Sequence, residues 1–254
     1  MPRYKSTTEK SKWTKTKWLL KDPHLKKHVP ATQKYSKSNL KKFVKRYQTV
    51  YYKPIYGTGG NGIAKVTRLG HKKYQVKSNS IHKITHSINS LHKKLKKISG
   101  SKSYILQRGI YLKLHKNRPF DVRVMVQKSK KEGWVPTAIF SKIGRKGKVA
   151  TNYHQGGRLA LLGETLRGAG YSESKIEKTR RKLKRMGIQS GRCFDRHRKG
   201  FRELGLDVAI DRKGRYWILE VNTRPQFYPL KHLKNKEPYR RIVKYGREYG
   251  RGNK

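Results

Sequence analysis

Acidic side chains, cysteine and long apolar runs are what this sequence of 254 residues has least of. It carries 14 Asp and Glu against 66 Lys and Arg, which gives a formal net charge of +52. Self-repulsion at this charge opposes a compact state, so we expect a polyanionic partner or a counterion shell. Nucleic acid, an anionic cell-wall polymer or an acidic protein would each serve, and the alternative is a solvated basic surface without a specific partner.

The scarcity of cysteine and of apolar runs excludes further classes of protein. Cys193 is the single cysteine, so an intrachain disulfide is impossible, and we interpret it as an ordinary thiol of a protein made in the reducing cytoplasm. No stretch is apolar enough for a signal peptide or a membrane span. The 16 Tyr, 6 Phe and 4 Trp nevertheless supply the large apolar surfaces that a folded core needs.

The apolar pattern predicts hairpins of strands with a few helices between them. Helices are expected over residues 40–47 and 174–189, and most clearly over 81–98, where one face carries Ile81, Ile84, Ile88, Leu91, Leu95 and Ile98. Strands are expected over residues 48–52, 63–69, 73–77, 104–107, 120–127, 134–143, 206–210 and 215–221. The basic tail from Lys231 onward is expected at the surface. Hairpins instead of repeated strand–helix units predict an α+β fold.

A glycine-rich turn follows the first of these strands, and its sequence Gly57-Thr58-Gly59-Gly60-Asn61-Gly62 fits G-x-G-x-x-G. A dinucleotide-binding fold would continue with a helix, but the strand-like IAKVTRL follows. A Walker A loop would continue with Lys and then Ser or Thr, where Ile63 and Ala64 stand. A protein kinase would carry H-R-D and D-F-G motifs, which are absent.

What remains is a strand–loop–strand hairpin with Lys53 on its incoming strand. Glycines let backbone N–H groups approach a polyphosphate closely, because no Cβ stands in the way. The ammonium group of Lys53 would add a positive charge for a phosphate oxygen. The alternative is a flexible hairpin loop without a ligand.

The few acidic residues are concentrated near the end of the chain, where four of the 14 are Glu203, Asp207, Asp211 and Glu220. Asp207 in LDVAI and Glu220 in WILEVN are flanked by apolar residues, where an unpaired carboxylate is costly. If Ile210 pairs with Arg215, Asp207 lies opposite Ile218, with Glu220 as a diagonal neighbour and Asn222 farther along the same face.

Two carboxylates and an amide oxygen are hard ligands, which predicts a magnesium site at Asp207, Glu220 and Asn222 completed by substrate phosphates. The alternative is that both carboxylates form ion pairs with nearby lysines or arginines. Asp211 is interpreted as a turn residue before Gly214.

One face of the strand over 120–127 carries Asp121 and Arg123. The guanidinium group of Arg123 could hold a phosphoryl group through a bidentate, charge-assisted contact. The alternative is a local Asp–Arg pair on an exposed sheet face.

The order of motifs along the chain resembles the ATP-grasp superfamily, and more closely its YheC/YheD group of endospore coat-associated proteins. The matching segments, within about residues 10–228, are KPIYGTGGNGI, YILQRGI, RPFDVRVMV, TNYHQGG, GLDVAID and WILEVNTRP. The resemblance implies two α+β lobes that hold ATP between them, without most of the usual N-terminal domain. It implies four segments: a basic one over residues 1–39, a small lobe over 40–105, a large lobe over 106–235 and a basic tail over 236–254.

The resemblance also implies roles for individual residues. The residues implied to bind ATP are Lys12, Lys53, Gly57, Thr58, Gly59, Gly60, Asn61, Gly62, Gln107, Arg108, Gly109 and Ile110. Arg123 and Arg224 would stabilise phosphate charge in catalysis, and Asp207, Glu220 and Asn222 would hold Mg²⁺. Asn152, Gly156 and Gly157 would form a loop that faces the substrate.

The function implied is an ATP-dependent carboxylate–amine ligase associated with the spore coat, acting on an acidic polymer or an acidic coat protein. A second hypothesis is a basic spore protein that keeps the ATP site without turnover. A third, a nucleic-acid reader, is disfavoured because Lys and Arg are spread along the chain and no reading motif is visible.

Overall fold

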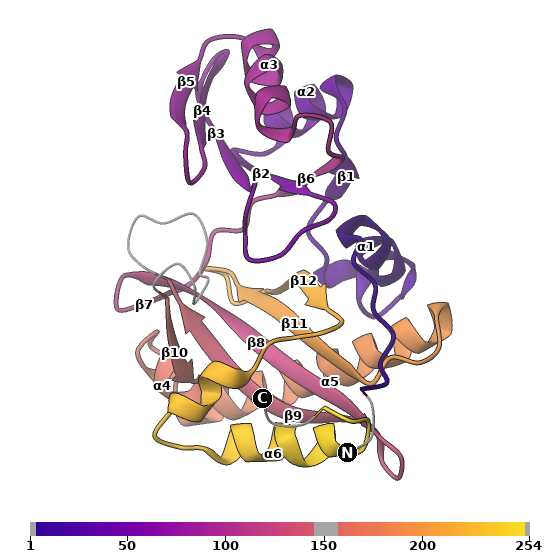
Figure 1. The fold of residues 1–254 in the computed structure, drawn as a ribbon. Helices are drawn as coiled ribbons and strands as arrows, with labels where there is room; N and C mark the ends of the chain where they lie inside the picture. The colour runs from indigo at the N-terminus through magenta and orange to yellow at the C-terminus, as the bar shows by residue number, and fades with distance from the viewer. Residues whose placement is uncertain (1–3, 145–156, 252–254) are drawn as a thin grey trace.

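The computed structural model describes residues 4–144 and 157–251 and contains two antiparallel sheets, one above the other in Figure 1. The upper sheet has the strand order β1-β6-β2-β3-β4-β5, and we call it, with its helices α2 and α3, the small lobe. The lower sheet has the order β10-β9-β8-β11-β12, with β7 paired to β8, and forms the large lobe. The predicted α+β class is confirmed, whereas the four segment boundaries stay predictions.

The small sheet buries one face beneath two helices. Its strands are β1 (Thr32–Lys34), β2 (Thr49–Pro54), β3 (Ala64–Gly70), β4 (Lys73–Lys77), β5 (His82–Thr85) and β6 (Tyr104–Arg108). Alternate residues such as Val50, Tyr52 and Val66 pack against Leu40 and Phe43 of α2 (Lys37–Arg46) and against α3. The same alternation leaves the opposite face of the sheet turned away from both helices.

The helix expected over 81–98 is wrong in its first part. Helix α3 spans Ile88–Ser99, and β5 occupies part of the residues before it. Ser87 ends the strand conformation because its side chain accepts the N–H of Ser90, whose own side chain accepts the N–H of Ser87, which is a capping box. Ile84 therefore lies on a strand, 46% exposed, instead of on the apolar helix face.

The large sheet is covered on both faces. Its strands are β7 (Leu114–His115), β8 (Arg118–Ser129), β9 (Gly133–Ile143), β10 (Arg158–Leu161), β11 (Glu203–Ile210) and β12 (Tyr216–Asn222). Helices α4 (Leu162–Arg167) and α5 (Glu173–His197) pack against the face that carries Phe120, Val122 and Val124. Helix α5 continues eight residues beyond the predicted end of this basic helix at position 189.

The C-terminal tail is not a surface extension, which corrects the expectation for residues after 231. Helix α6 (Glu237–Arg247) follows the 3-10 turn η3 (Tyr228–His232), and both pack under the other face of the large sheet. Leu230 and Ile242 are fully buried there against Met125 and Phe140. The apolar side chains of the tail therefore close a second core of the large lobe.

The N-terminal segment also belongs to the fold. Helix α1 (Lys12–Lys21) and the 3-10 turn η1 (Lys26–His28) lie against α5 and β12. Glu203, which is buried at the start of β11, accepts hydrogen bonds from Tyr4 and Tyr249 and pairs with Arg251. Both ends of the described chain are thus fastened to the large sheet.

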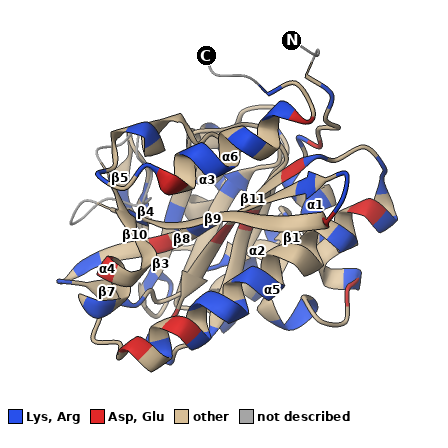
Figure 2. Cartoon of the chain, turned by 90° about the horizontal axis from the view of Figure 1, so that it is seen from below, with Lys and Arg blue, Asp and Glu red and all other residues tan. Residues whose placement is uncertain are grey.

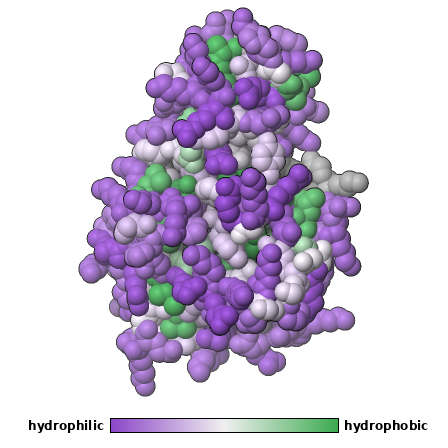
Figure 3. All heavy atoms as spheres, turned by 180° about the vertical axis from the view of Figure 1, so that it is seen from behind, coloured by the Kyte–Doolittle hydropathy of each residue, from purple (hydrophilic) through white to green (hydrophobic). Residues whose placement is uncertain are grey.

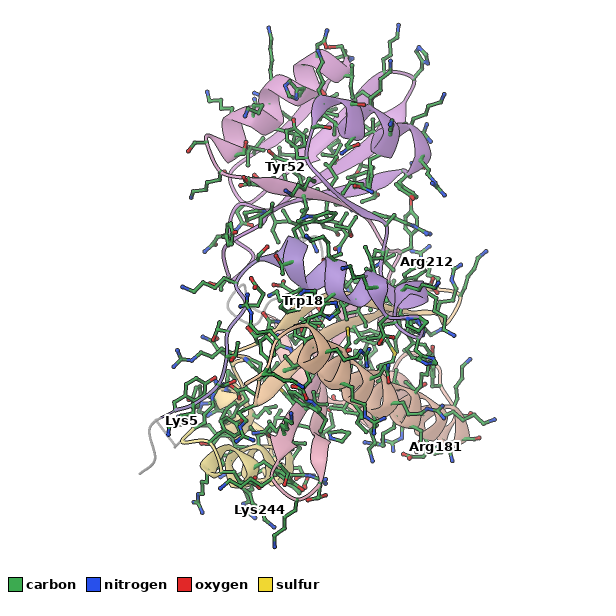
Figure 4. The ribbon with its side chains drawn as sticks, turned by 90° about the vertical axis from the view of Figure 1, so that its right-hand side faces the viewer. Lys5, Trp18, Tyr52, Arg181, Arg212 and Lys244 are labelled. Carbon is green, nitrogen blue, oxygen red and sulfur yellow. The ribbon has the colours of Figure 1, made fainter. Side chains whose placement is uncertain are left out.

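The surface is basic almost everywhere. Lys and Arg lie along α5 and α6 in Figure 2, and the face behind Figure 1 is mostly hydrophilic with small separate apolar spots (Figure 3). Side chains such as Arg181 and Lys244 lie at the outer surface of the large lobe (Figure 4). Across residues 4–144 and 157–251, none of the helices combines the length and the hydropathy required to cross a bilayer.

Candidate functional site

A cleft of about 510 Å³ lies between the two sheets. The small lobe lines it with Tyr51 and Lys53 of β2 and with the glycine loop between β2 and β3. The large lobe lines it with charged residues of β8, β9, β11 and β12 and with the segment that follows β12. Residues far apart in the sequence thus meet in one concave site.

The glycine loop forms one wall with a backbone that needs glycine. Gly57, Gly59, Gly60 and Gly62 have φ angles of 127°, 71°, 79° and 72°, which side chains with a Cβ rarely adopt. Lys12 at the start of α1 donates from Nζ to the carbonyl oxygen of Gly57 at 2.6 Å, so the N-terminal helix holds the loop. The loop carries no side-chain bulk at its glycines and can approach a ligand through its backbone.

Lys53 stands beside this loop. Its Nζ donates to Oε1 of Gln107 at 2.6 Å and lies 5.6 Å from the ring centroid of Tyr51. Burial lowers the pKa of Lys53 and the neighbouring Lys12 lowers it further, while Glu220 across the cleft offsets part of this lowering. A buried ammonium group held by a neutral amide is a charge that an anionic ligand would stabilise.

The opposite wall is built around Asp207 on β11. Arg123 of β8 donates to both carboxylate oxygens, from Nε at 2.7 Å and from Nη2 at 3.2 Å, and Lys142 of β9 donates at 2.8 Å. Lys142 also pairs with Asp121 at 3.0 Å. Although burial alone would raise the pKa of Asp207, Arg123 and Lys142 hold it well below its usual range. Asp207 is therefore a carboxylate at neutral pH, neutralised by two cations.

The hairpin register differs from the one predicted. Ile210 pairs with Tyr216 instead of Arg215, and a bulge between Asp207 and Val208 shifts the register again. Asp207 consequently lies directly opposite Glu220, not diagonal to it. A β-bulge inserts one residue and re-aims the side chains beside it, which brings the two carboxylates closer in register than regular pairing would.

Glu220 and Asn222 of β12 complete this wall. Glu220 lies 3.7 Å from Nζ of Lys12 and 4.0 Å from Nζ of Lys15, with its side chain 26% exposed. Nδ2 of Asn222 donates to Asp207 at 3.3 Å and to the carbonyl of Gly205 at 3.4 Å. The alternative considered from the sequence, in which both carboxylates pair with lysines or arginines, is what the structure displays.

The donor set still suits one magnesium ion. Mg²⁺ is usually held by one or two carboxylates, with waters and substrate phosphates supplying the other oxygens. Asp207 and Glu220 face each other and Asn222 adds an amide oxygen. Three or more His, Cys, Asp or Glu side chains do not gather at any point of the described residues, so an all-protein metal cage is not formed there.

A comparison with protein families decides what kind of cleft this is. The family described as YheC/D like ATP-grasp matches residues 4–251. The chain belongs to this family. Its sheets and cleft are therefore an ATP-grasp fold, as the order of its motifs predicts.

Relatives and solved structures agree. The chain is 29% identical over 222 residues to the endospore coat-associated protein YheD of Bacillus subtilis (strain 168), covering 85% of this chain and 48% of that protein. It is 25% identical over 227 residues to YheC of the same organism, covering 84% and 59%. The chain thus spans about half the length of the curated relatives it matches.

Two solved enzymes share the fold at low identity. N5-carboxyaminoimidazole synthase from Aspergillus clavatus, in complex with ADP and 5-aminoimidazole ribonucleotide, matches with a TM-score of 0.53 and 11% identity over 87% of this chain and 48% of that one. D-cycloserine synthetase DcsG matches with a TM-score of 0.54 and 10% identity over 92% and 71%.

Most of the predicted site residues of this ATP-grasp chain line one cleft. Those that line it are Lys12, Lys53, Gly57, Thr58, Gly59, Gly60, Asn61, Gln107, Ile110, Arg123, Asp207, Glu220, Asn222 and Arg224. Asn152 and Gly156 lie outside the described residues, and Gly157 is described but is not part of the cleft lining. The roles assigned to all of them stay predictions.

Three other predicted residues stand back from the cleft. The N–H groups of Arg108 and Gly109 donate to the carbonyls of Ala31 and Thr49 at 2.8 Å each, so they hold the sheet together. A Cβ on Gly62 would lie 2.9 Å from the hydroxyl of Tyr104, which gives this glycine a packing role. Gln107 of β6 and Ile110, which follows β6, both reach the cleft.

Sequence reasoning missed Lys142 and Lys15. Lys142 enters the site because β9 pairs with β8 so that it lies opposite Asp121. Lys15 follows Lys12 by three residues on α1, a spacing that places both on one helix face. That spacing was a usable signal for Lys15, whereas Lys142 depends on a strand register that the sequence leaves open.

Proposed function

We propose that this ATP-grasp chain binds Mg-ATP in the cleft and joins a carboxylate to an amine through an acyl phosphate. The observation that supports this most is the pairing of two walls: Lys53 and the glycine loop face Arg123, Lys142, Asp207 and Glu220 across one cavity. One wall suits phosphates and the other suits a metal ion and a transferred phosphoryl group. We propose association with the spore coat from the names of the two curated relatives.

In the proposed reaction a substrate carboxylate oxygen attacks the γ-phosphorus of ATP. The bond from that phosphorus to the bridging oxygen breaks, ADP leaves, and an acyl phosphate remains. The amine then attacks its carbonyl carbon, releases inorganic phosphate and loses a proton to solvent. Lys53 and the glycine loop would hold the triphosphate, while Arg123 and Arg224 would offset the charge on the transferred group.

Asp207, Glu220 and Asn222 would hold Mg²⁺, which supplies charge neutralisation for the phosphates when bound. In the described structure, Arg123 and Lys142 both form ion pairs with the carboxylate of Asp207. Both cations could turn from that carboxylate toward phosphate oxygens, because both line the same cleft. The protein's own ion pairs would thus be exchanged for contacts with the ligand.

Thermal unfolding with and without Mg-ATP tests the binding step. A ligand that binds the folded state alone raises the melting temperature. Lys53→Ala is expected to abolish most of that rise, whereas Lys41→Ala, which removes an exposed lysine from α2, should leave it intact. No rise in the unaltered protein at millimolar Mg-ATP would contradict the proposal.

A second candidate function is a spore-associated protein that keeps the ATP site without turnover. The neutralisation of Asp207 by two cations favours it, because a structural ion-pair cluster needs no metal. Release of ADP in the presence of amino acids, acidic peptides and wall polymers separates the two. Stabilisation by Mg-ATP without ADP release on any acceptor would select the silent protein.

A further inference from the structure

The face of the small sheet that its helices leave open continues the wall of the cleft. Tyr51, which lines the cleft, pairs with Lys65 of β3, and Lys65 pairs with Lys77 of β4. Lys77 in turn pairs with His82 of β5. Directly paired residues share one face of a sheet, so these side chains form a line that starts in the cleft. We call Lys65, Lys77 and His82 the basic row.

Burial along the basic row decreases with distance from the cleft. Lys65 and Lys77 are half-buried, and His82 at the last strand is exposed. The opposite face of the same strands carries Val66 and Val76, which pack under α2 and α3. Among the described residues, the row therefore lies on the face turned away from α2 and α3, and its far end at His82 is exposed.

Two lysines placed directly opposite each other are an unfavourable arrangement. Like charges in this position destabilise a sheet. Burial lowers the pKa of Lys65, and Lys77 lowers it further. An anion beside Lys65 would relieve the repulsion and stabilise its charged form.

The small lobe contains no acidic side chain that could pair with the basic row. Asp22 and Asp121 are consecutive acidic residues along the sequence, so residues 23 to 120 contain no Asp or Glu. The sheet is thus a positively charged surface joined to a cleft whose proposed reaction requires a carboxylate. One kind of molecule satisfies both features, namely a chain in which carboxylates repeat.

We propose that the basic row binds carboxylates of an acidic polypeptide whose reacting group lies in the cleft, which rests on the proposed ligase function. From Tyr51 at the cleft to His82 the line crosses three strand spacings, roughly 14 Å. About four residues of an extended chain cover this length, and alternate side chains on one side stand roughly 7 Å apart. Two carboxylates of one peptide can therefore face the row while a third enters the cleft.

The row alone does not distinguish carboxylates from phosphates, because ammonium groups bind both kinds of anion. The cleft selects the carboxylate, since its proposed reaction consumes one and the phosphate backbone of a nucleic acid has none. Nucleic acid is the competing occupant, and a single-stranded oligonucleotide distinguishes it from an acidic polypeptide.

The experiment measures binding of fluorescein-labelled hexaglutamate to the full chain at low salt. The test variant is Lys65→Gln with Lys77→Gln. The matched control is Lys41→Gln with Lys45→Gln, which removes the same charge from α2 on the other face of the sheet. We expect about tenfold weaker binding in the test variant, as the loss of two partly exposed ion pairs implies, and less than about twofold in the control. Free glutamate should compete weakly, because it cannot occupy the row and the cleft together.

Equal losses in the two variants would overturn the proposal in favour of non-specific attraction. A single-stranded oligonucleotide of equal charge that binds as tightly, and loses as much affinity in the test variant, would overturn the choice of an acidic polypeptide. If the double variant does not fold, His82→Gln at an exposed position provides a second test. Unchanged affinity of His82→Gln for hexaglutamate would count against the row. Mg-ATP should still raise the melting temperature of every variant. Failure of that rise in the unaltered protein would instead reject the proposed function.

Discussion

The two walls of the cleft carry positive charge in opposite ways. On the wall of the small lobe, Lys53 is held by the neutral side chain of Gln107 and the lobe has no carboxylate. On the wall of the large lobe, Arg123 and Lys142 are matched by Asp207 and Asp121. The first wall gains charge pairing from a ligand, whereas the second already has it.

This difference predicts opposite consequences for the same kind of substitution. Removing charge from the small-lobe wall should weaken ligand binding and leave folding largely intact, because the lost charge was paired with no acid of its own lobe. Removing a charge from Asp207 should damage folding first, because the cations around it are buried and lose their partner. Glu220 lies between these cases, since its ion pairs are long and a quarter of its side chain is exposed.

The largest effect is expected for Glu220→Gln, which keeps the shape and removes one charge of the proposed metal site. ADP release with an accepted substrate should fall about a thousandfold, because a metal contributes several kcal/mol to charge stabilisation in phosphoryl transfer. The melting temperature should hardly change, as surface-like ion pairs contribute about 0–1 kcal/mol. Glu177→Gln, on the far side of the large sheet, is the control and should keep full activity. A strongly destabilised Glu220→Gln protein with unchanged magnesium dependence would assign Glu220 to structure.

Asp207→Asn should be the most destabilising of the substitutions considered. It leaves Arg123 buried without its carboxylate, while Lys142 keeps Asp121, and the loss of a buried partner costs about 3–5 kcal/mol. Urea unfolding at neutral pH measures the cost. Because the pKa of Asp207 is lowered in the folded state, this stabilisation is present above the ordinary carboxylate range and is lost as the pH falls through the lowered pKa. A cost no larger than that of Glu177→Gln would remove the contrast between the walls.

The sequence predicts local features of both walls and misses features that depend on register. The glycine loop with Lys53, and the alternation that separates Phe120 from Arg123, are set by neighbouring residues and are found as predicted. The direct pairing of Asp207 with Glu220 arises from a bulge, and Lys142 arrives through the pairing of β8 with β9. Neither feature has a marker within a few residues along the chain.

Two elements differ from the sequence-based expectation for different physical reasons. Regular apolar spacing extends the predicted helix back to Ile81, but the Ser87–Ser90 capping box fixes where α3 begins. The capping pair was visible in the sequence and could have decided the boundary. The charge of the tail after residue 231 predicts a surface position, although Ile242 and Val243 of α6 fill a core that forms only when the large sheet is assembled.

A moderate effect is expected for Gly62→Ala, which tests whether the small-lobe wall depends on its backbone shape. Gly62 has a φ of 72°, and an added Cβ would lie 2.9 Å from the hydroxyl of the buried Tyr104. Alanine in the left-handed backbone conformation lowers the free energy of unfolding by about 1–2 kcal/mol, which urea unfolding should measure. Gly70→Ala is the control, because no atom lies within 4 Å of the added Cβ, and its cost should stay below about 1 kcal/mol. Equal costs at both positions would show that the loop tolerates side chains.

The smallest effect concerns the pH dependence of ligand binding, and it tests whether Lys53 is the group that a ligand completes. Burial lowers the pKa of Lys53 in the ligand-free chain, whereas phosphate oxygens beside it would raise that pKa. Binding of Mg-ATP would therefore be coupled to uptake of a proton, and its affinity should decrease as the pH rises above neutrality toward the ordinary lysine range. Calorimetry in buffers of different ionisation enthalpy measures the proton directly. Lys53→Arg keeps a group that stays protonated, so its affinity should depend less on pH in this range. An identical decrease in Lys53→Arg and in the unaltered protein would place the titrating group elsewhere in the cleft, and the small-lobe wall would then owe its phosphate affinity to the glycine loop.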